Sequence, residues 1–248
     1  MRLRIIMAVL LACASVPTTG QTTAAFSPSA DEVIARMSKR EVQRETVSGG
    51  YTGTRQYVLE NHLFAKHAQM IVSVAGDPDG TTHFQVVSKE GWNSGNNYLR
   101  QALETESEVS RPSMRPMSRI TKDNYAFQMI GTDLLNGRTA YVIEVIPKRQ
   151  DVYLFRGRIW VDAEDYALAR IDGQLAKTPS YWIRVVHFTL EYRKSGGFWF
   201  PWSSTSTSEV RVFGDTYVTI RFLDYSPQPA SAAKHSDLSP REASYVKH

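Results

Sequence analysis

The stretch of sequence that decides the fold is RGRIWVDAEDYALARI, which runs from Arg156 to Ile171. Its two ends belong to longer strand-like stretches, Val152–Asp162 and Ala167–Leu175. The tight turn Ala163-Glu164-Asp165 lies between them, and short acidic side chains commonly satisfy the backbone of such turns. Two strands joined by a tight turn pair with each other, so this stretch predicts an antiparallel hairpin.

The same hairpin pattern extends over most of the chain. Asn136-Gly137 is the strongest hairpin signal, and it joins a strand around Phe127–Ile130 to the strand Thr139–Ile146. No spacing typical of βαβ units is present, so we expect one antiparallel meander of about ten strands. The remaining strands are expected at Thr52–Asn61, Gln69–Ala75, Thr81–Ser88, Tyr181–Arg193, Phe198–Phe213 and Thr216–Tyr225.

Two segments have a helical pattern instead. An amphipathic stripe runs from Ala30 to about Thr46, and Asp31 and Glu32 lie in its first turn, where the helix dipole favours acids. Trp92–Ser110 lacks strict alternation and suits a second helix, whereas Arg111–Arg119 contains two prolines and is expected to be a loop.

The balance of strands and helices limits the architecture. A sheet of this size must curl or close, and two helices are enough to cover only one of its faces. The sequence therefore predicts a mainly β (α+β) fold, with a single strongly curved antiparallel sheet that forms an incomplete β-barrel. The helices are expected to cover the concave face.

Residues 1–20 are expected to be a secretory signal peptide outside the fold. Arg2 and Arg4 precede an apolar segment, Ile5 to Ala12, that is too short to cross a bilayer. An alternative is lipidation of Cys13, because Leu-Leu-Ala-Cys resembles a lipobox, but the short apolar segment favours cleavage near Gly20. The exported chain would then hold one domain at residues 30–225 and a disordered tail at 227–248.

The composition excludes several classes of protein. The formal net charge is +4, which is too mild to make nucleic acid the expected partner. A single cysteine excludes a disulfide scaffold and a cysteine-cluster metal site. The sequence has no Gly-x-Ser-x-Gly elbow, glycine-rich phosphate loop or His-Glu-x-x-His motif. We therefore expect that the protein is not an enzyme and that it has no catalytic residue, metal or cofactor. Asp162, Glu164 and Asp165 are interpreted as turn residues.

Alternation along the strands separates one apolar face from a polar one. This face has two interpretations, an ordinary packed core or a cavity for a long apolar ligand. The large ratio of sheet to helix favours a face that two helices cannot fill. The candidate lipid-binding residues are Tyr141, Ile143, Val145, Tyr153, Phe155, Ile159, Trp182, Val186, Phe188, Val218, Ile220 and Phe222.

The aromatic run Phe198-Trp199-Phe200-Pro201-Trp202 is the most informative local feature. Its side chains cannot all face one core, and Pro201 cannot donate a ladder hydrogen bond in a central strand. The segment is therefore expected at an edge, a bulge or a cavity rim. One interpretation is an aromatic corner of the core, and the other is a rim that contacts a ligand or a membrane through Phe198, Trp199, Phe200 and Trp202.

Four stretches together resemble a known family. The strongest is a strand that ends in Trp160-Val161-Asp162, followed by a turn and a strand with Arg170-Ile171. The others are Tyr141-Val-Ile-Glu-Val145, Gly197-Phe-Trp-Phe-Pro201 and Glu209-Val-Arg-Val-Phe-Gly214. They resemble the outer-membrane lipoprotein-sorting proteins of the LolA/LolB-like superfamily, which also includes the sensor domain of RseB-type regulators. The resemblance covers about residues 30–225.

The resemblance implies a periplasmic carrier that binds the acyl chains of a lipoprotein or lipid in a hydrophobic half-barrel cavity. Its role would be outer-membrane lipoprotein sorting or lipid transport, and its partners would be acyl chains and a protein of the inner or outer membrane. The chain would be a monomer that contacts membranes transiently. The alternative is an RseB-like envelope-stress sensor without enzymatic activity. No lid-fastening arginine can be carried over, because the corresponding stretch is Thr81-Thr-His-Phe-Gln-Val86.

Overall fold

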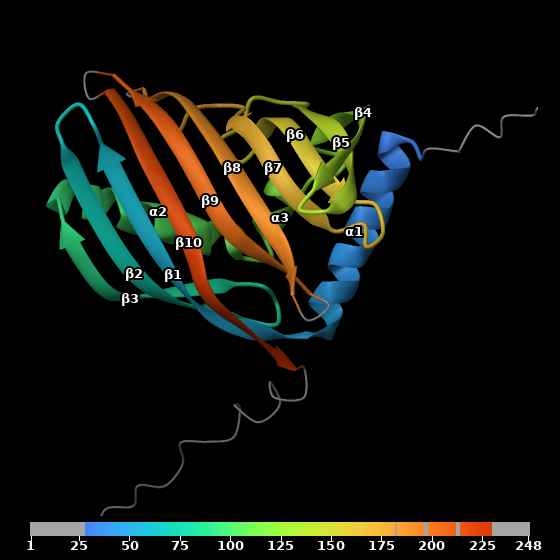
Figure 1. Cartoon of the computed structure of the whole chain (residues 1–248), viewed down its shortest axis with the longest axis horizontal. Coiled ribbons are helices and arrows are strands. Elements are labelled where there is room, and N and C mark those ends of the chain that lie inside the picture. The colour runs from blue at the N-terminus through green and yellow to red at the C-terminus, as the bar shows by residue number, and fades with distance from the viewer. Residues whose placement is uncertain (1–27, 182, 196–197, 212–213, 230–248) are drawn as a thin grey trace, which may run out of the picture.

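The computed structural model describes residues 28–181, 183–195, 198–211 and 214–229 of the chain. Ten strands form one antiparallel sheet in the order β3-β2-β1-β10-β9-β8-β7-β6-β5-β4. The first and last members of this order, β3 and β4, are not paired with each other, so the sheet is open (Figure 1). The strands are β1 Ser48–Asn61, β2 Lys66–Gly76, β3 Thr82–Gly91, β4 Tyr125–Leu135, β5 Arg138–Pro147, β6 Phe155–Asp162, β7 Leu168–Leu175, β8 Ile183–Ser195, β9 Phe198–Val210 and β10 Gly214–Pro229.

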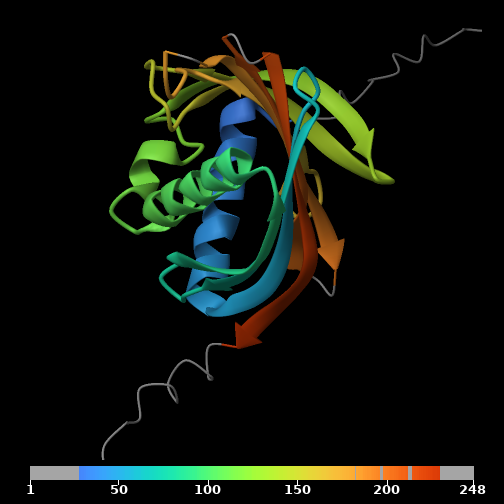
Figure 2. The same cartoon turned by 90° about the vertical axis from the view of Figure 1, so that its left-hand side faces the viewer.

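The sheet curls around two long helices, α1 (Ala30–Val47) and α2 (Asn93–Ser110). Figure 2 shows both helices on the concave side of the sheet. The predicted fold class is therefore confirmed: an open, curved antiparallel sheet with few helices. The physical reason for the antiparallel pairing is local. Nearly every strand is followed directly by a short connection that lets it pair with the next strand along the chain.

Two boundaries differ from the expectations. The segment expected to be a loop contains a short helix, α3 (Arg115–Ser118), because Pro116 is tolerated in the first turn of a helix. β10 continues to Pro229, so the tail does not begin at residue 227; Pro227 and Pro229 lie opposite Tyr51 and Ser48 of β1. The predicted signal peptide, Cys13 and residues 230–248 lie outside the described residues.

The core of the concave side is divided into two hydrophobic clusters, one beneath each helix. In the α1 cluster, Val33, Ile34 and Met37 of the helix pack on buried residues that come mainly from β4–β7. In the α2 cluster, Leu99 and Leu103 of the helix pack mainly on β1 and β2. α1 therefore buries more large apolar side chains against the sheet than α2 does.

The hairpin that decides the fold is held by Asp162, which is almost completely buried. Its carboxylate accepts hydrogen bonds from Arg138 Nε at 2.6 Å and Nη2 at 2.8 Å. It also accepts the backbone N–H groups of Glu164 at 3.1 Å and Asp165 at 2.7 Å. Burial alone would raise the pKa of Asp162, but Arg138 and the two amides outweigh burial and lower it. Asp162 thus satisfies the backbone of the turn, as the sequence predicts, whereas the Asp165 carboxylate pairs with Lys194 and accepts a hydrogen bond from Trp199.

Candidate functional site

The middle of the concave face lies between the two clusters, on β8, β9 and β10. The register places Phe188 of β8 opposite Ser206 of β9, and Ser206 opposite Val218 of β10. Leu190, Ser204 and Ile220 form the next row in the same way. Side chains two residues apart point to the same face, so these rows form one strip. We call it the central strip: Val186, Phe188, Leu190, Ser204, Ser206, Ser208, Val218, Ile220 and Phe222.

The two outer strands of the central strip, β8 and β10, contribute apolar side chains, and the middle strand, β9, contributes small serines. Its serines come from β9, whose sequence from residue 203 to residue 208 is SSTSTS. Ser208 and Val218 are buried, whereas the other members are half-buried. Phe188 and Leu190 adjoin the α1 cluster, and Ile220 adjoins the α2 cluster. The strip therefore offers apolar side chains that the protein covers only in part.

The candidate lipid-binding residues divide into two groups. Ile143, Val145, Phe155 and Ile159 are buried in the α1 cluster, so they are packed core residues in this structure. Tyr141 is half-buried beside the same cluster. The other group is the part of the candidate set that lies on the central strip: Val186, Phe188, Val218, Ile220 and Phe222. Their contact with a lipid stays a prediction.

Two further candidates, Tyr153 and Trp182, belong to neither group. Tyr153 does not lie on a strand as the alternation suggested, because β6 begins only at Phe155. Its backbone N–H instead donates to Asp151 Oδ1 at 3.1 Å, which closes a turn ahead of the strand. Trp182 lies outside the described residues.

A buried cation holds α2 to the concave face. Arg55 of β1 is buried, and its Nη1 donates to Glu106 Oε1 of α2 at 2.7 Å and to the Tyr57 hydroxyl at 3.3 Å. The Arg55 guanidinium also lies 4.5 Å from the centre of the Phe222 ring, on the central strip. Burial alone would lower the pKa of Arg55, but the Glu106 carboxylate outweighs it and raises the pKa. Burial raises the pKa of Tyr57 to about 12.

This ion pair was not predicted from the sequence. The signal was present in β1, where a charged residue stands in the alternating series Arg55, Tyr57 and Leu59. A charge on an apolar face requires a partner. The partner is 51 residues away on α2, and only the folded chain shows it.

Aromatic side chains gather near the end of the central strip where β8 meets β9. The rings of Tyr51 and Tyr225 stack with centres 4.8 Å apart, and Phe200 lies 4.2 Å from Tyr225. Trp202 is exposed, and the Arg193 guanidinium lies 4.1 Å from its ring centre. Phe200 and Trp202 thus lie near this end of the central strip, and their role as a rim that contacts a ligand or membrane stays a prediction.

The other two members of the predicted rim differ. Trp199 is buried among Ala167 and Ala169 in a third cluster, and its Nε1 donates to Asp165 at 2.9 Å. It therefore belongs to the packing of the sheet, because adjacent strand residues point to opposite faces and Trp199 alternates with Phe200. The side chain of Phe198 lies outside the described part of the structure.

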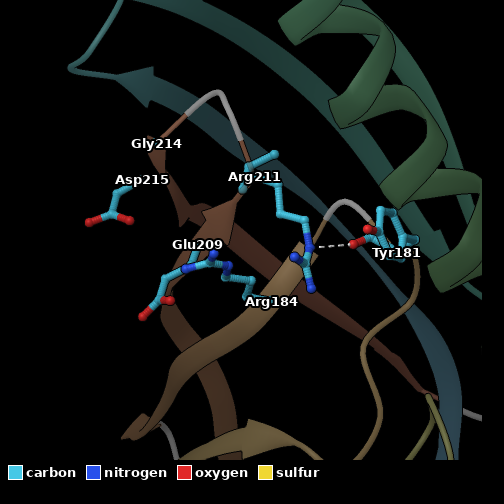
Figure 3. Close-up of a pocket in the computed structure, with 7 residues that line it drawn as sticks. Tyr181, Arg184, Glu209, Arg211, Gly214 and Asp215 are labelled. Atoms are coloured by element: carbon cyan, nitrogen blue, oxygen red, sulfur yellow. Dashed lines mark hydrogen bonds between the residues drawn. The ribbon is translucent and has the colours of Figure 1, made fainter.

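Two of the surface pockets in the described part of the structure lie away from the central strip. The larger, of about 600 Å³, is lined by Tyr181, Arg184, Glu209, Val210, Arg211, Gly214 and Asp215 (Figure 3). The smaller, of about 280 Å³, lies beside the Arg138–Asp162 pair. Both are open to solvent, and neither includes a member of the central strip.

The described residues contain no group of three or more His, Cys, Asp and Glu side chains that could hold a metal ion. Among the helices that the structure describes, none is both long enough and apolar enough to cross a membrane. The arrangement on the concave face offers apolar contact and hydroxyl groups, which suit binding of an amphiphile.

Comparison with solved structures finds similar chains of low sequence identity. One is a domain assigned as an outer membrane lipoprotein-sorting protein from Vibrio parahaemolyticus, with 14% identity and a TM-score of 0.43 over 79% of this chain and 92% of that chain. A LolA superfamily protein from Nitrosomonas europaea has 11% identity and a TM-score of 0.40 over 86% of this chain and all of that chain. The MucA/MucB complex of Pseudomonas aeruginosa has 11% identity and a TM-score of 0.27 over 79% of this chain and 99% of that chain.

Comparison with protein families gives a direct assignment. No curated protein matches the sequence. Residues 67–226 match the model of a family of unknown function, DUF5686, and this match spans β2 to β10 with α2 and α3. Because the matched region is more than half of the chain, the chain belongs to the DUF5686 family.

Proposed function

We propose that this protein is an exported carrier that binds the acyl chains of a lipoprotein or lipid along the central strip. The observation that carries the proposal is the half-buried state of Phe188, Leu190 and Ile220 on a concave face whose two helices pack over the flanking strands. Apolar side chains that the protein leaves partly uncovered inside a curved sheet favour an apolar ligand.

The strip suits a chain-like ligand for a steric reason. Ser204 and Ser206 are small, and they lie between Phe188 and Leu190 on one side and Val218 and Ile220 on the other. An acyl chain along β9 would contact both apolar rows, and each buried methylene contributes about 0.8 kcal/mol. Ten to fifteen methylenes would therefore supply roughly 8–12 kcal/mol, before the cost of ordering the chain is subtracted.

Release requires the concave face to open, and α2 is the helix suited to that movement. It buries only Leu99 and Leu103 as large apolar side chains, whereas α1 buries Val33, Ile34 and Met37. The Arg55–Glu106 pair fastens α2 directly above the edge of the strip. A membrane or protein partner that competes for either charge would loosen this cover.

The experiment is to fill the strip and measure bound lipid. Ser206→Phe places a ring between Phe188 and Val218, whereas Thr205→Phe places the same ring on the opposite face of the same strand. Protein purified after export is analysed by native mass spectrometry, followed by extraction of any lipid. We expect lipid on the wild-type and Thr205→Phe proteins and at least tenfold less on Ser206→Phe.

The outcomes separate the proposal from its rivals. Lipid-free wild-type protein that also takes up no lipid from vesicles would contradict the carrier function. Capture of one membrane regulator, without transfer of lipid between vesicles, would favour the RseB-like sensor instead. Equal lipid on the Ser206→Phe and Thr205→Phe proteins would show that the ligand binds away from the central strip.

A further inference from the structure

Three large apolar side chains are exposed together at one end of the sheet. Leu63 and Phe64 lie in the turn between β1 and β2 and are 64% and 48% exposed, and Tyr181, just before β8, is 74% exposed. We call this set the apolar tip. Figure 1 shows the β1–β2 turn and the start of β10 at the same end of the molecule.

The two segments of the apolar tip lie at the same end of the sheet, because the start of β10 lies beside the β1–β2 turn and also lines the pocket that Tyr181 lines. Leu63 lies against the start of β10, because a Cβ built on Gly214 would be 3.1 Å from Leu63 Cδ2. Gly214 in turn lines the same pocket as Tyr181. The turn itself is well formed: the Phe64 N–H donates to Asn61 Oδ1 at 3.0 Å, and Ala65 adopts a left-handed conformation with φ 49°. The exposure of Leu63 and Phe64 is therefore a property of an ordered turn.

Charged groups lie directly beside the tip and balance each other. Arg211 Nε donates to the carbonyl oxygen of Tyr181 at 3.0 Å, and its guanidinium lies 4.7 Å from the centre of the Tyr181 ring (Figure 3). Arg184 lines the same pocket as the carboxylates of Glu209 and Asp215. Two cations and two anions leave the lining of this pocket without a formal net charge.

We propose that the apolar tip inserts into the surface of a lipid bilayer and docks the protein there. The proposal does not depend on ligand binding at the central strip, because the tip contains none of its residues. An aromatic ring with an arginine stacked on it is suited to the boundary between headgroups and acyl chains. The absence of net charge in the pocket implies that apolar insertion, and not attraction to anionic lipids, drives the docking.

The size of the tip favours a bilayer over a second copy of the chain. Its three side chains expose on the order of 400 Å² in total, whereas a stable protein interface buries about 800 Å² on each partner. The side chains also project from turns and do not form a flat face. Projecting apolar side chains of this kind can insert into the interface of a lipid bilayer, because lipids rearrange around them.

The test compares two variants by co-sedimentation with vesicles. Leu63→Ser combined with Phe64→Ser removes two of the three side chains of the tip, and Val87→Ser removes a residue of β3 that is as exposed as Leu63, as the control. The samples are proteins purified after export, with an intact mass that shows no covalent lipid. Vesicles of phosphatidylcholine alone are compared with vesicles that also contain phosphatidylglycerol.

We expect wild-type and Val87→Ser proteins to bind both kinds of vesicle within a factor of three, and the double variant to bind at least tenfold more weakly. Wild-type protein that binds neither vesicle, or a double variant that binds like wild type, would overturn the proposal. Size-exclusion chromatography completes the test, because a wild-type dimer that the double variant converts to a monomer would identify the tip as a contact between copies. Loss of vesicle binding with full lipid retention would separate this result from any failure of the carrier function.

Discussion

The Arg55–Glu106 pair allows a prediction in which two substitutions at one contact differ in their effect on stability. Glu106→Gln keeps a hydrogen-bond acceptor for Arg55 but leaves a buried cation without its counter-charge. Arg55→Met removes the cation and retains an apolar side chain of similar length against Phe222 and Phe84. Buried pairs replaced by apolar residues often keep or gain stability, whereas a broken pair loses it.

The structure sets the size of the expected effects. Breaking a fully buried pair costs about 3–5 kcal/mol. The side chain of Glu106 is 42% exposed, so water screens part of the interaction and we expect Glu106→Gln to lose about 1–2 kcal/mol of unfolding free energy. The unfolding free energy of Arg55→Met should stay within about 1 kcal/mol of wild type. The variant that combines Arg55→Met with Glu106→Gln should have the same unfolding free energy as Arg55→Met alone.

Urea denaturation measures the difference. A loss of about 1–2 kcal/mol moves the midpoint of unfolding by roughly 0.5–1 M. Glu104→Gln, an exposed position on the same helix, is the matched control and should not move it. Should Glu106→Gln unfold at the wild-type midpoint, or Arg55→Met lose more stability than Glu106→Gln, the pair does not hold α2 as described.

Two further predictions concern the hairpin that decides the fold. Because Arg138 and turn amides lower the pKa of Asp162, its contribution to stability is present above the pKa of the unfolded chain, about 4, and is lost as the pH falls below it. Wild-type protein should thus lose more stability than Asp162→Asn between pH 6 and pH 3 in urea titrations; parallel losses would contradict this origin. Gly157→Ala should lower the thermal midpoint by more than 10 °C, since its Cβ would lie 2.1 Å from the Asp172 carbonyl oxygen. Gly137→Ala, with no atom near its Cβ, should lose only about 1 kcal/mol, and equal losses would show that the close approach is absent.

The elements that the sequence predicted correctly are those whose pairing is decided by neighbouring residues. Asn136-Gly137 and the acidic turn after Asp162 each join strands that are adjacent along the chain, so their pairing is decided within a few residues. The second helix was expected at residues 92–110 and is found at Asn93–Ser110 for the same reason. For the aromatic run the sequence left two interpretations open, a core corner and a rim, because alternation distinguishes two faces of a strand without showing which face another part of the chain covers; the structure shows Trp199 buried in a packed cluster.

The sequence by itself determined a curved antiparallel sheet with helices on one face, since hairpin turns and strand alternation are properties of neighbouring residues. Only the tertiary structure decided that Ile143 and Val145 are core beneath α1 while Phe188 and Ile220 remain half-buried between the helices. It also decided that Arg55 meets Glu106 and that Leu63 lies against Gly214. These contacts join residues 51 and 151 positions apart, and their geometry depends on how far the whole sheet curls and where each helix crosses it.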